Sequence, residues 1–468
     1  MSATTTAFVE PRTRSRTIPV EIVVCLIVFA AFCVAVLTRT AQMLEPDDYA
    51  YRASIVALTH GHILLTNAQH AALDRQLAAG GGQGILQWHH LASGMWVSEK
   101  NPGYPFFAVV FHLLGMLRVT PLFWGALACA GLFVGARRWL GRWAGVWAVV
   151  LYCSSGAALV FAWRATMPSF TDASLIAAGT GCLLCAMVAT DAPERRRLLL
   201  GLLGFLAIDG AVFIRYTNVV ELIVAAAAIV VARRSARLSW RTVSAWLASI
   251  ALFGAGVLVF NQLVYGAATA TGYSAGEITF STSALLPNLE HMPGQLLRAM
   301  PMLLLGLAAA VWIAVRLLRT RGSHDPGARS AGRRDALVAV ALVAGWLGLW
   351  ALYASYTWTA QMSGQGASQT VHVIRFYVPV IGLIALLGAW LLAHLPRRLP
   401  PVALAVIVVL GVLSFQSMAG QGMGGRFGAG PGGAPGGGVP GGSAPGLQQA
   451  PPGGAQGGAA PSGATSGG

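Results

Sequence analysis

Charged residues are scarce in this sequence. Asp, Glu, Lys and Arg together make up 10% of the 468 residues, and Lys100 is the only lysine. Soluble globular proteins usually carry about 25% charged residues, whereas 56% of the residues here are hydrophobic. The scarcity of charge excludes a soluble protein and predicts a multi-pass protein of the cell membrane.

Acidic residues are fewer than basic ones, 16 against 31, which gives a net charge of +15. In a soluble protein this excess would suggest a nucleic-acid partner. Here the arginines stand in short blocks between apolar segments, which is typical of the cytoplasmic loops of membrane proteins. We therefore expect no nucleic acid as a partner, and membrane lipids as the surroundings.

Cysteine is limited to six residues, all of them inside apolar segments. No loop cysteine is available for a disulfide. The pair Cys182 and Cys185 has the spacing of some metal and redox sites, but buried free cysteine behaves as a small hydrophobic residue. We interpret this pair as packing.

About eleven apolar segments are long enough to cross a membrane as helices, which requires roughly 17 to 25 residues each. The sequence therefore predicts an all-α polytopic fold. The segments with defined bounds are Pro19–Thr38, Val119–Ala136, Trp143–Trp163, Ala173–Ala189, Leu198–Ile214, Ser244–Tyr265, Ala336–Trp358 and Val402–Phe415. Three more end before the arginines at 233, 316 and 397.

The arginine blocks set the predicted orientation. Arg12, Arg14 and Arg16 precede the first span and place the N-terminus in the cytoplasm by the positive-inside rule. Residues Tyr104–Leu117 are apolar but short, and we expect them to lie at the membrane interface. Counting them as a span would put Arg142 on the outer side. With this choice the spans alternate consistently, and the C-terminus lies outside.

Three regions follow from this pattern. Residues 1–18 form a cytoplasmic segment, and residues 19–418 form the transmembrane domain, whose large first outer loop covers about 39–118 and contains juxtamembrane helices. Residues 419–468 are rich in Gly and Pro. Such a composition cannot bury a core, so we expect a disordered tail outside the cell.

The outer side of this arrangement holds a sparse set of polar residues. Positive charge is under-represented at the outer ends of spans, so these cations suggest an anion site, because arginine and lysine suit a phosphate. For each arginine alone, contact with lipid headgroups is the alternative. The set comprises Asp47, Asp48, Lys100, Arg164, Asp172, Arg215, His372, Arg375 and Tyr377.

The carboxylates could supply a general base, which takes the proton of an incoming hydroxyl or amine while the cations hold a phosphate leaving group. Asp47 and Asp48 are adjacent and point in different directions, so only one is expected to be the base. We prefer Asp48. Asp172 stands at the outer start of a span, where it could instead be the helix N-cap.

Several short motifs in this order and on these sides of the membrane resemble the GT-C superfamily of glycosyltransferases. The similarity is greatest to the group that contains the aminoarabinose lipid A transferases and the protein O-mannosyltransferases. The motifs are Glu45-Pro-Asp-Asp48-Tyr, Lys100-Asn-Pro-Gly-Tyr-Pro105, Arg137-Arg-Trp-Leu-Gly-Arg142, the turn from Pro168 to Asp172, and Arg375-Phe-Tyr-Val-Pro379.

The resemblance implies a GT-C fold and an enzyme that moves a hexosyl or pentosyl unit from a polyprenyl-phosphate donor, with inversion at the sugar carbon. It implies Asp48 or Asp47 as the base, Asp172 as a second acidic residue, and Lys100 and Arg375 at the donor phosphate. Arg215 and Arg164 are further phosphate ligands of the predicted anion site, and His372, Tyr377 and Glu45 are additional candidates.

Two features differ from the family pattern. The first motif reads Asp-Asp where the mannosyltransferases have Asp-Glu, and no soluble domain follows the last predicted span. The sequence therefore does not determine whether the sugar acceptor is a glycan, a lipid or a protein. No cofactor is expected with certainty. Five histidines between 60 and 90 could suggest a divalent metal, but their spacing matches no zinc pattern, so we assign no metal ligand.

A transporter or flippase of a lipid-linked or anionic solute is the alternative function. Transporters usually place their substrate site near the midplane of the bilayer, between repeated halves of the chain. The sequence shows no convincing internal repeat, and its polar set lies at one membrane face. These observations favour the enzyme.

Overall fold

The computed structural model describes residues 18–40, 43, 45–79, 84–273, 278–320, 326–366 and 369–421. Most of the predicted N-terminal segment and of the predicted tail lies outside these residues. The last helix, α18 (Leu399–Gln421), continues past the predicted start of the tail at residue 419.

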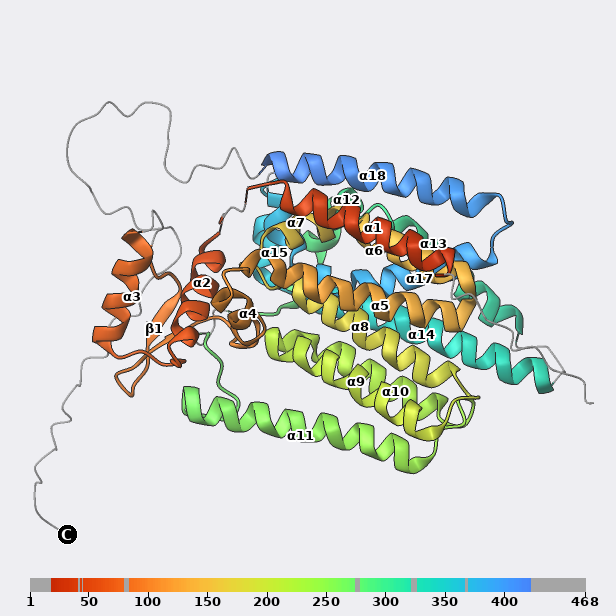
Figure 1. The fold of residues 1–468 in the computed structure, drawn as a ribbon, viewed down its shortest axis with the longest axis horizontal. Coiled ribbons are helices and arrows are strands. Elements are labelled where there is room, and N and C mark those ends of the chain that lie inside the picture. The colour runs from red at the N-terminus through yellow and green to blue at the C-terminus, as the bar shows by residue number, and fades with distance from the viewer. Residues whose placement is uncertain are drawn as a thin grey trace, which may run out of the picture. The chain divides into compact units, whose positions relative to one another are not determined.

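Long helices lie side by side and form a bundle (Figure 1). Besides α18 they are α1 (Val20–Leu37), α5 (Thr120–Leu140), α6 (Arg142–Cys153), α7 (Gly156–Trp163), α8 (Ser169–Val188), α9 (Glu194–Ile214), α10 (Val219–Ala232), α11 (Trp240–Tyr265), α13 (Leu303–Thr320), α14 (Pro326–Ala354) and α17 (Ile381–His394). Short 3-10 turns are η1 (Leu117–Val119), η2 (Tyr216–Asn218), η3 (Thr282–Ala284) and η5 (Val378–Val380).

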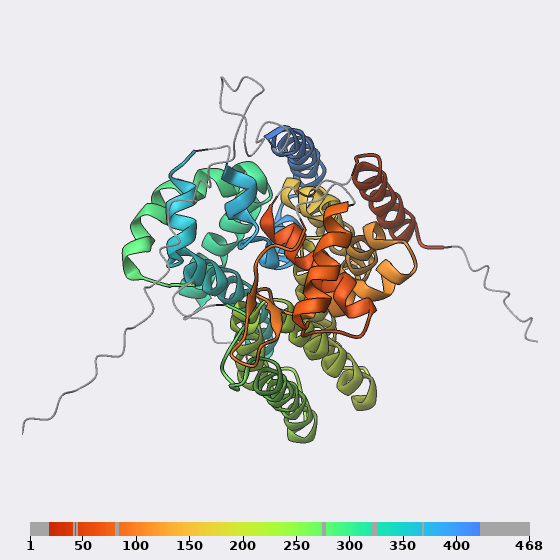
Figure 2. The same cartoon turned by 90° about the vertical axis from the view of Figure 1, so that its left-hand side faces the viewer.

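Residues 45–79 and 84–113, called the lobe below, lie at one end of the bundle (Figures 1 and 2). The lobe contains α2 (Pro46–Thr59), α3 (Asn67–Ala79), β1 (Trp88–His90), β2 (Trp96–Ser98) and α4 (Gly103–Leu113). The two strands are antiparallel, with Trp88 opposite Ser98. Three shorter helices, α12 (Leu285–Ala299), α15 (Thr357–Ser363) and α16 (Thr370–Ile374), contact one another.

Small residues allow the bundle helices to approach closely, as is common in membranes. A Cβ placed on Gly131 of α5 would lie 2.8 Å from the Cα of Ala178 of α8, and one on Gly135 would lie 3.0 Å from the Cα of Gly181. Helix α17 is apolar on all sides and buried from Ile381 to Leu392. A helix without a polar face belongs in the interior, so α17 is the centre of the bundle.

The described residues confirm an all-helical membrane fold apart from the two-stranded sheet. Seven of their helices are long and apolar enough to cross a membrane, or nine if each of two bent pairs counts as one span. Helices α10 and α17 belong to shorter apolar segments, 216–232 and 378–394. The number of eleven spans therefore stays a prediction.

Two details of the predicted spans differ in the structure. The predicted span Trp143–Trp163 is broken into α6 and α7, which bend by 59°. The predicted span from Ala173 begins earlier, as α8 starts at Ser169 and its N-cap is Pro168. The alternative that Asp172 is the N-cap is therefore wrong. Helix α4 has eleven residues, too few to cross a bilayer, as expected for an interfacial helix.

Candidate active site

The first turn of α2 sets the directions of its three carboxylates. Pro46 occupies the first helical position, where its missing N–H costs nothing. Glu45 is the N-cap, and its backbone N–H donates to Asp48 Oδ2 at 3.1 Å, which is half of a capping box. Asp48 is thus turned back onto the helix end. Asp47 points elsewhere, as expected for adjacent residues.

Asp48 is enclosed by its partners. Arg164 Nη2 lies 2.5 Å from Oδ2, and Thr166 Oγ1 donates to Oδ1 at 2.6 Å. The Asp48 side chain is 0% exposed. A carboxylate in this position orders the connection between α7 and α8 and has little room for a substrate.

Glu45 links three cationic or titratable side chains. Its Oε1 accepts from Arg164 Nη1 at 2.6 Å and lies 3.0 Å from His372 Nδ1, while Arg375 Nη1 donates to Oε2. Burial alone would raise the pKa of Glu45, but Arg164 and Arg375 outweigh it and hold the pKa well below its usual range. Glu45 therefore stays ionised and fixes the positions of both arginines.

Asp47 is the more accessible aspartate, with 15% of its side chain exposed. Its Oδ1 lies 3.1 Å from Lys100 Nζ, and its Oδ2 lies 2.8 Å from Arg375 Nη1. Burial opposes its ionisation, but Arg375 and Lys100 outweigh this effect and lower the pKa of Asp47. Asp47 is thus an ionised carboxylate between two cations.

Lys100 is positioned by the strand before it and the helix after it. Its backbone N–H donates to Ser98 Oγ at 3.1 Å, and its Nζ lies 5.0 Å from the centre of the Tyr273 ring, within range of a cation–π contact. Three residues later, Gly103 begins α4 directly against α9. A Cβ on Gly103 would collide with the backbone of Phe213 and Ile214.

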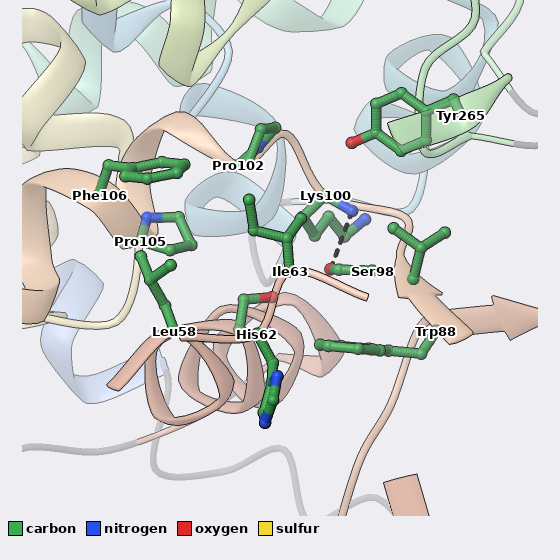
Figure 3. A pocket seen from close by; sticks show the side chains of 12 residues that line it. Leu58, His62, Ile63, Trp88, Ser98, Lys100, Pro102, Pro105, Phe106 and Tyr265 are labelled. Atoms are coloured by element: carbon green, nitrogen blue, oxygen red, sulfur yellow. Dashed lines mark hydrogen bonds between the residues drawn. The ribbon is translucent and has the colours of Figure 1, made fainter. Parts of the chain in front are cut away.

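A pocket next to Lys100 is mostly apolar (Figure 3). Residues of α2, α4, the two strands and the connections between them line the pocket, and Tyr265 at the end of α11 lies at one side. The lining residues are Ser54, Leu58, His62, Ile63, Trp88, Val97, Ser98, Lys100, Pro102, Pro105, Phe106 and Tyr265. An apolar cavity with a single lysine suits a ligand that has a hydrocarbon part and an anionic part.

Arg375 lies beside two aromatic rings. Its guanidinium carbon lies 5.1 Å from the ring centre of Trp358 and 4.9 Å from that of Phe376. Together with the ion pairs to Glu45 and Asp47, these contacts fix the plane of the guanidinium. The arginine is thus preorganised as a donor toward Asp47.

Asp172 and Arg215 form a separate pair. Arg215 Nε lies 3.5 Å from Asp172 Oδ2, and Asp172 is fully buried. Arg215 Nη1 also donates to the backbone oxygen of Arg375 at 2.9 Å, and its Nη2 donates to Ser169 Oγ at 3.2 Å. This pair supports the backbone of Arg375 and does not contact Asp47.

The structure brings together most of the predicted site residues. Glu45, Asp47, Asp48, Lys100, Arg164, His372 and Arg375 form one connected group, called the ion-pair cluster below. Tyr377 is not among them. It is 2% exposed, and its ring lies 5.6 Å from that of Trp350.

Sequence reasoning missed Thr166 and Tyr273. Thr166 stands two residues after Arg164, so its proximity in the chain was a usable signal. Tyr273 lies in the connection between α11 and α12, which has no motif, and no sequence signal pointed to it. The histidines of the lobe make other contacts: His70 stacks on Trp96 at 4.1 Å. Within the described residues, no three His, Cys, Asp or Glu side chains are grouped as metal ligands would be.

Comparison with known proteins shows a likeness in fold. No family model matches the sequence, and no curated protein does. A crystal structure of ArnT from Cupriavidus metallidurans bound to undecaprenyl phosphate aligns with a TM-score of 0.51 and 16% identity, covering 84% of this chain and 64% of that one. The oligosaccharyltransferase AglB from Archaeoglobus fulgidus, in complex with an inhibitory peptide and a dolichol-phosphate, gives a TM-score of 0.49 and 11% identity, covering 86% and 56%.

The chain thus spans less than two thirds of the length of either protein. ArnT is a GT-C membrane glycosyltransferase. The chain has a GT-C fold, as the motifs in its sequence led us to expect.

Proposed function

We propose that this protein is a glycosyltransferase. It moves a sugar from a polyprenyl-phosphate donor to a glycan, lipid or protein acceptor on the outer face of the cell membrane, with inversion at the sugar carbon. The observation that carries this proposal is the position of Lys100. The same lysine pairs with Asp47 and lines an apolar pocket.

The pocket and the cations fit the two parts of such a donor. The first isoprene units occupy the apolar pocket, next to Phe106, whose side chain is 42% exposed. The phosphate binds Lys100 and Arg375, a point charge and a planar donor respectively. The neighbour in fold, ArnT, was crystallised with undecaprenyl phosphate, which agrees with this class of ligand.

Asp47 is the general base in this proposal, in place of Asp48. Asp48 is enclosed by Arg164 and Thr166, whereas Asp47 is partly exposed beside the proposed phosphate ligands. As the acceptor oxygen or nitrogen bonds to the sugar carbon, Asp47 takes its proton. The bond between the sugar carbon and the phosphate oxygen breaks, and its electron pair leaves with the polyprenyl phosphate.

The remaining predicted residues act by positioning. Ion pairs that do not involve Asp47 keep the rest of the cluster in place, and their members are Glu45, Arg164, Asp48 and His372. The pair of Asp172 and Arg215 supports the Arg375 backbone. Because side chains that bind a transition state must be held closely in place, these contacts contribute to rate without touching substrate.

The orientation follows from the arginines at the bundle end away from the lobe. Helix α5 begins near the lobe at Thr120 and ends with Arg137 and Arg138. Arg142 pairs with Glu21 near the start of α1 at 2.7 Å. By the positive-inside rule that end is cytoplasmic, the ion-pair cluster faces outward, and the C-terminus lies outside.

The test is a transfer assay with purified protein and a panel of decaprenyl- and undecaprenyl-phosphate sugars. We expect at least one donor to release polyprenyl phosphate together with a glycosylated acceptor, and Asp47→Asn protein to release it about 10²-fold more slowly or slower still. No release with any donor, together with movement of a lipid-linked or anionic solute in vesicles, would overturn the enzyme in favour of a transporter.

A further inference from the structure

The proposed base and the proposed phosphate ligands are bound to each other in this structure. Asp47 Oδ1 pairs with Lys100, and Asp47 Oδ2 pairs with Arg375. Within the described part of the chain, Asp47 has no further ion pair or side-chain hydrogen bond. Both oxygens of the base are thus held by the two cations that the donor phosphate needs.

This arrangement cannot persist when the donor binds. A phosphate at Lys100 and Arg375 would place a second anion within a few ångströms of Asp47, and like charges at that distance repel strongly. Moreover, a carboxylate held by two cations is a weak proton acceptor, because the cations stabilise its ionised form. One carboxylate of the cluster therefore has to lose its ion pairs with these cations.

Asp47 is the carboxylate that can move away from the cations. Glu45 is 4% exposed and has three partners, and Asp48 is 0% exposed and bonded to Arg164, Thr166 and its own helix end. Asp47 is 15% exposed and has only the two cations among the described residues. Moving Asp47 away breaks no other contact of the cluster.

We propose that the donor phosphate releases Asp47 by replacing it at Lys100 and Arg375, so that the base becomes free only when the donor is bound. This inference rests on the proposed function, because it takes a phosphate donor at these cations. The freed carboxylate then accepts the acceptor proton as the sugar carbon–oxygen bond to phosphate breaks. When polyprenyl phosphate departs, Asp47 loses the proton to water and returns to the cations.

An ordered reaction follows. An acceptor that arrives first meets a carboxylate already held by two cations, so productive binding requires the donor before the acceptor. The coupling is reciprocal, since Asp47 competes with phosphate for Lys100 and Arg375 in equilibrium binding. Removing the Asp47 charge should therefore tighten phosphate binding while it slows transfer.

Binding of undecaprenyl phosphate to the purified full-length protein tests this competition without any activity. We expect Asp47→Asn to bind it about tenfold more tightly than the wild type, within the usual range of coupling between sites. The matched control is Asp74→Asn, which removes the same charge from the lobe. Asp74 accepts from the Ile85 backbone N–H and is not part of the cluster, so this variant should bind like the wild type.

Equal or weaker binding by Asp47→Asn overturns the release of Asp47 and leaves the donor proposal standing. Equal tightening by Asp74→Asn also overturns it, because the effect would then follow net charge. If neither the wild type nor the variants bind undecaprenyl phosphate, the proposed function fails and this inference fails with it. Asp47→Ser is measured in parallel, with thermal unfolding of each variant, so that loss of fold is separated from loss of binding.

Discussion

The adjacent residues Asp47 and Asp48 have different partners, and this difference separates their proposed roles. Asp48 accepts the N–H of the α2 N-cap, Glu45, and is bonded to Arg164 and Thr166, while Asp47 lies between Lys100 and Arg375. The first arrangement is that of a structural carboxylate, which orders two segments far apart in the sequence. The second is that of a carboxylate that a charged ligand can displace.

Replacing the two aspartates by asparagine should separate these roles. In Asp47→Asn, turnover should fall by about 10²-fold or more, because the proton acceptor is lost. This variant should lose less stability than Asp48→Asn, because the Asp47 side chain is 15% exposed and that of Asp48 is 0% exposed. Asp48→Asn leaves Arg164 with one buried anionic partner fewer, which should lower the free energy of unfolding by about 3–5 kcal/mol. Transfer rates and thermal unfolding in detergent measure both effects. Normal turnover in Asp47→Asn would return the role of base to Asp48.

Glu45 should make stability depend on pH. Its pKa is held well below the usual range, so its contribution is fully present above the unfolded pKa, about 4.3, and is lost as pH falls below it. The midpoint of thermal unfolding should therefore drop between about pH 5 and pH 3 in the wild type. Glu45→Gln should lower the midpoint at pH 7 and flatten this dependence. Glu290→Gln, on the exposed side of α12, should retain the wild-type curve.

The sequence predicted which side chains meet but not their pairing. Ionisable side chains close to apolar segments are costly to bury unless they pair with one another, which is why Lys100, Arg164 and Arg375 could be named. The choice between Asp47 and Asp48 depended on a capping box and on Arg164, which is 116 residues away from Asp48. Such a contact is a property of the packed chain. Tyr273 could not be found because nothing in its surroundings in the sequence marks it.

Helix α4 connects the helix bundle to the ion-pair cluster. It begins three residues after Lys100 and packs against the end of α9 through Gly103. The sequence indicated a short interfacial helix here, because its apolar run is too short to span. It did not indicate the break between α6 and α7, since the whole segment is apolar and only Ser154 and Ser155 stand at the bend.

Gly103→Ala should therefore reduce transfer although Gly103 touches no proposed substrate. The added Cβ would collide with the backbone of Phe213 and Ile214, so α4 has to shift and carries Lys100 with it. A displacement of about 1 Å can cost about 10²-fold in rate. Gly254→Ala in α11 is the control, because a Cβ there meets no atom within 4 Å. Similar transfer rates in the two variants would show that Lys100 does not depend on this contact.

Charge is distributed unevenly across the whole molecule. The ion-pair cluster and the lobe lie at one end of the bundle, and the ends of α5 and α9 away from the lobe carry Arg137, Arg138 and Arg196 with adjacent basic residues. This separation is the pattern that fixes orientation during insertion. From this pattern we propose that the reaction takes place outside the cell, where the acceptor is then found.

Labelling of intact cells with a membrane-impermeant maleimide tests this orientation. In a background without the six native cysteines, Gly82→Cys should react from outside, because the loop at 39–118 is predicted to face outward. Ser323→Cys, in the predicted inner loop, should react only after lysis. A reporter fused after Arg142 should likewise be cytoplasmic. If Arg142 proves external, the segment Tyr104–Leu117 has to be a span, and the side of the membrane assigned to every later helix reverses. Labelling of both cysteines from the same side would contradict the proposed outer location of the ion-pair cluster.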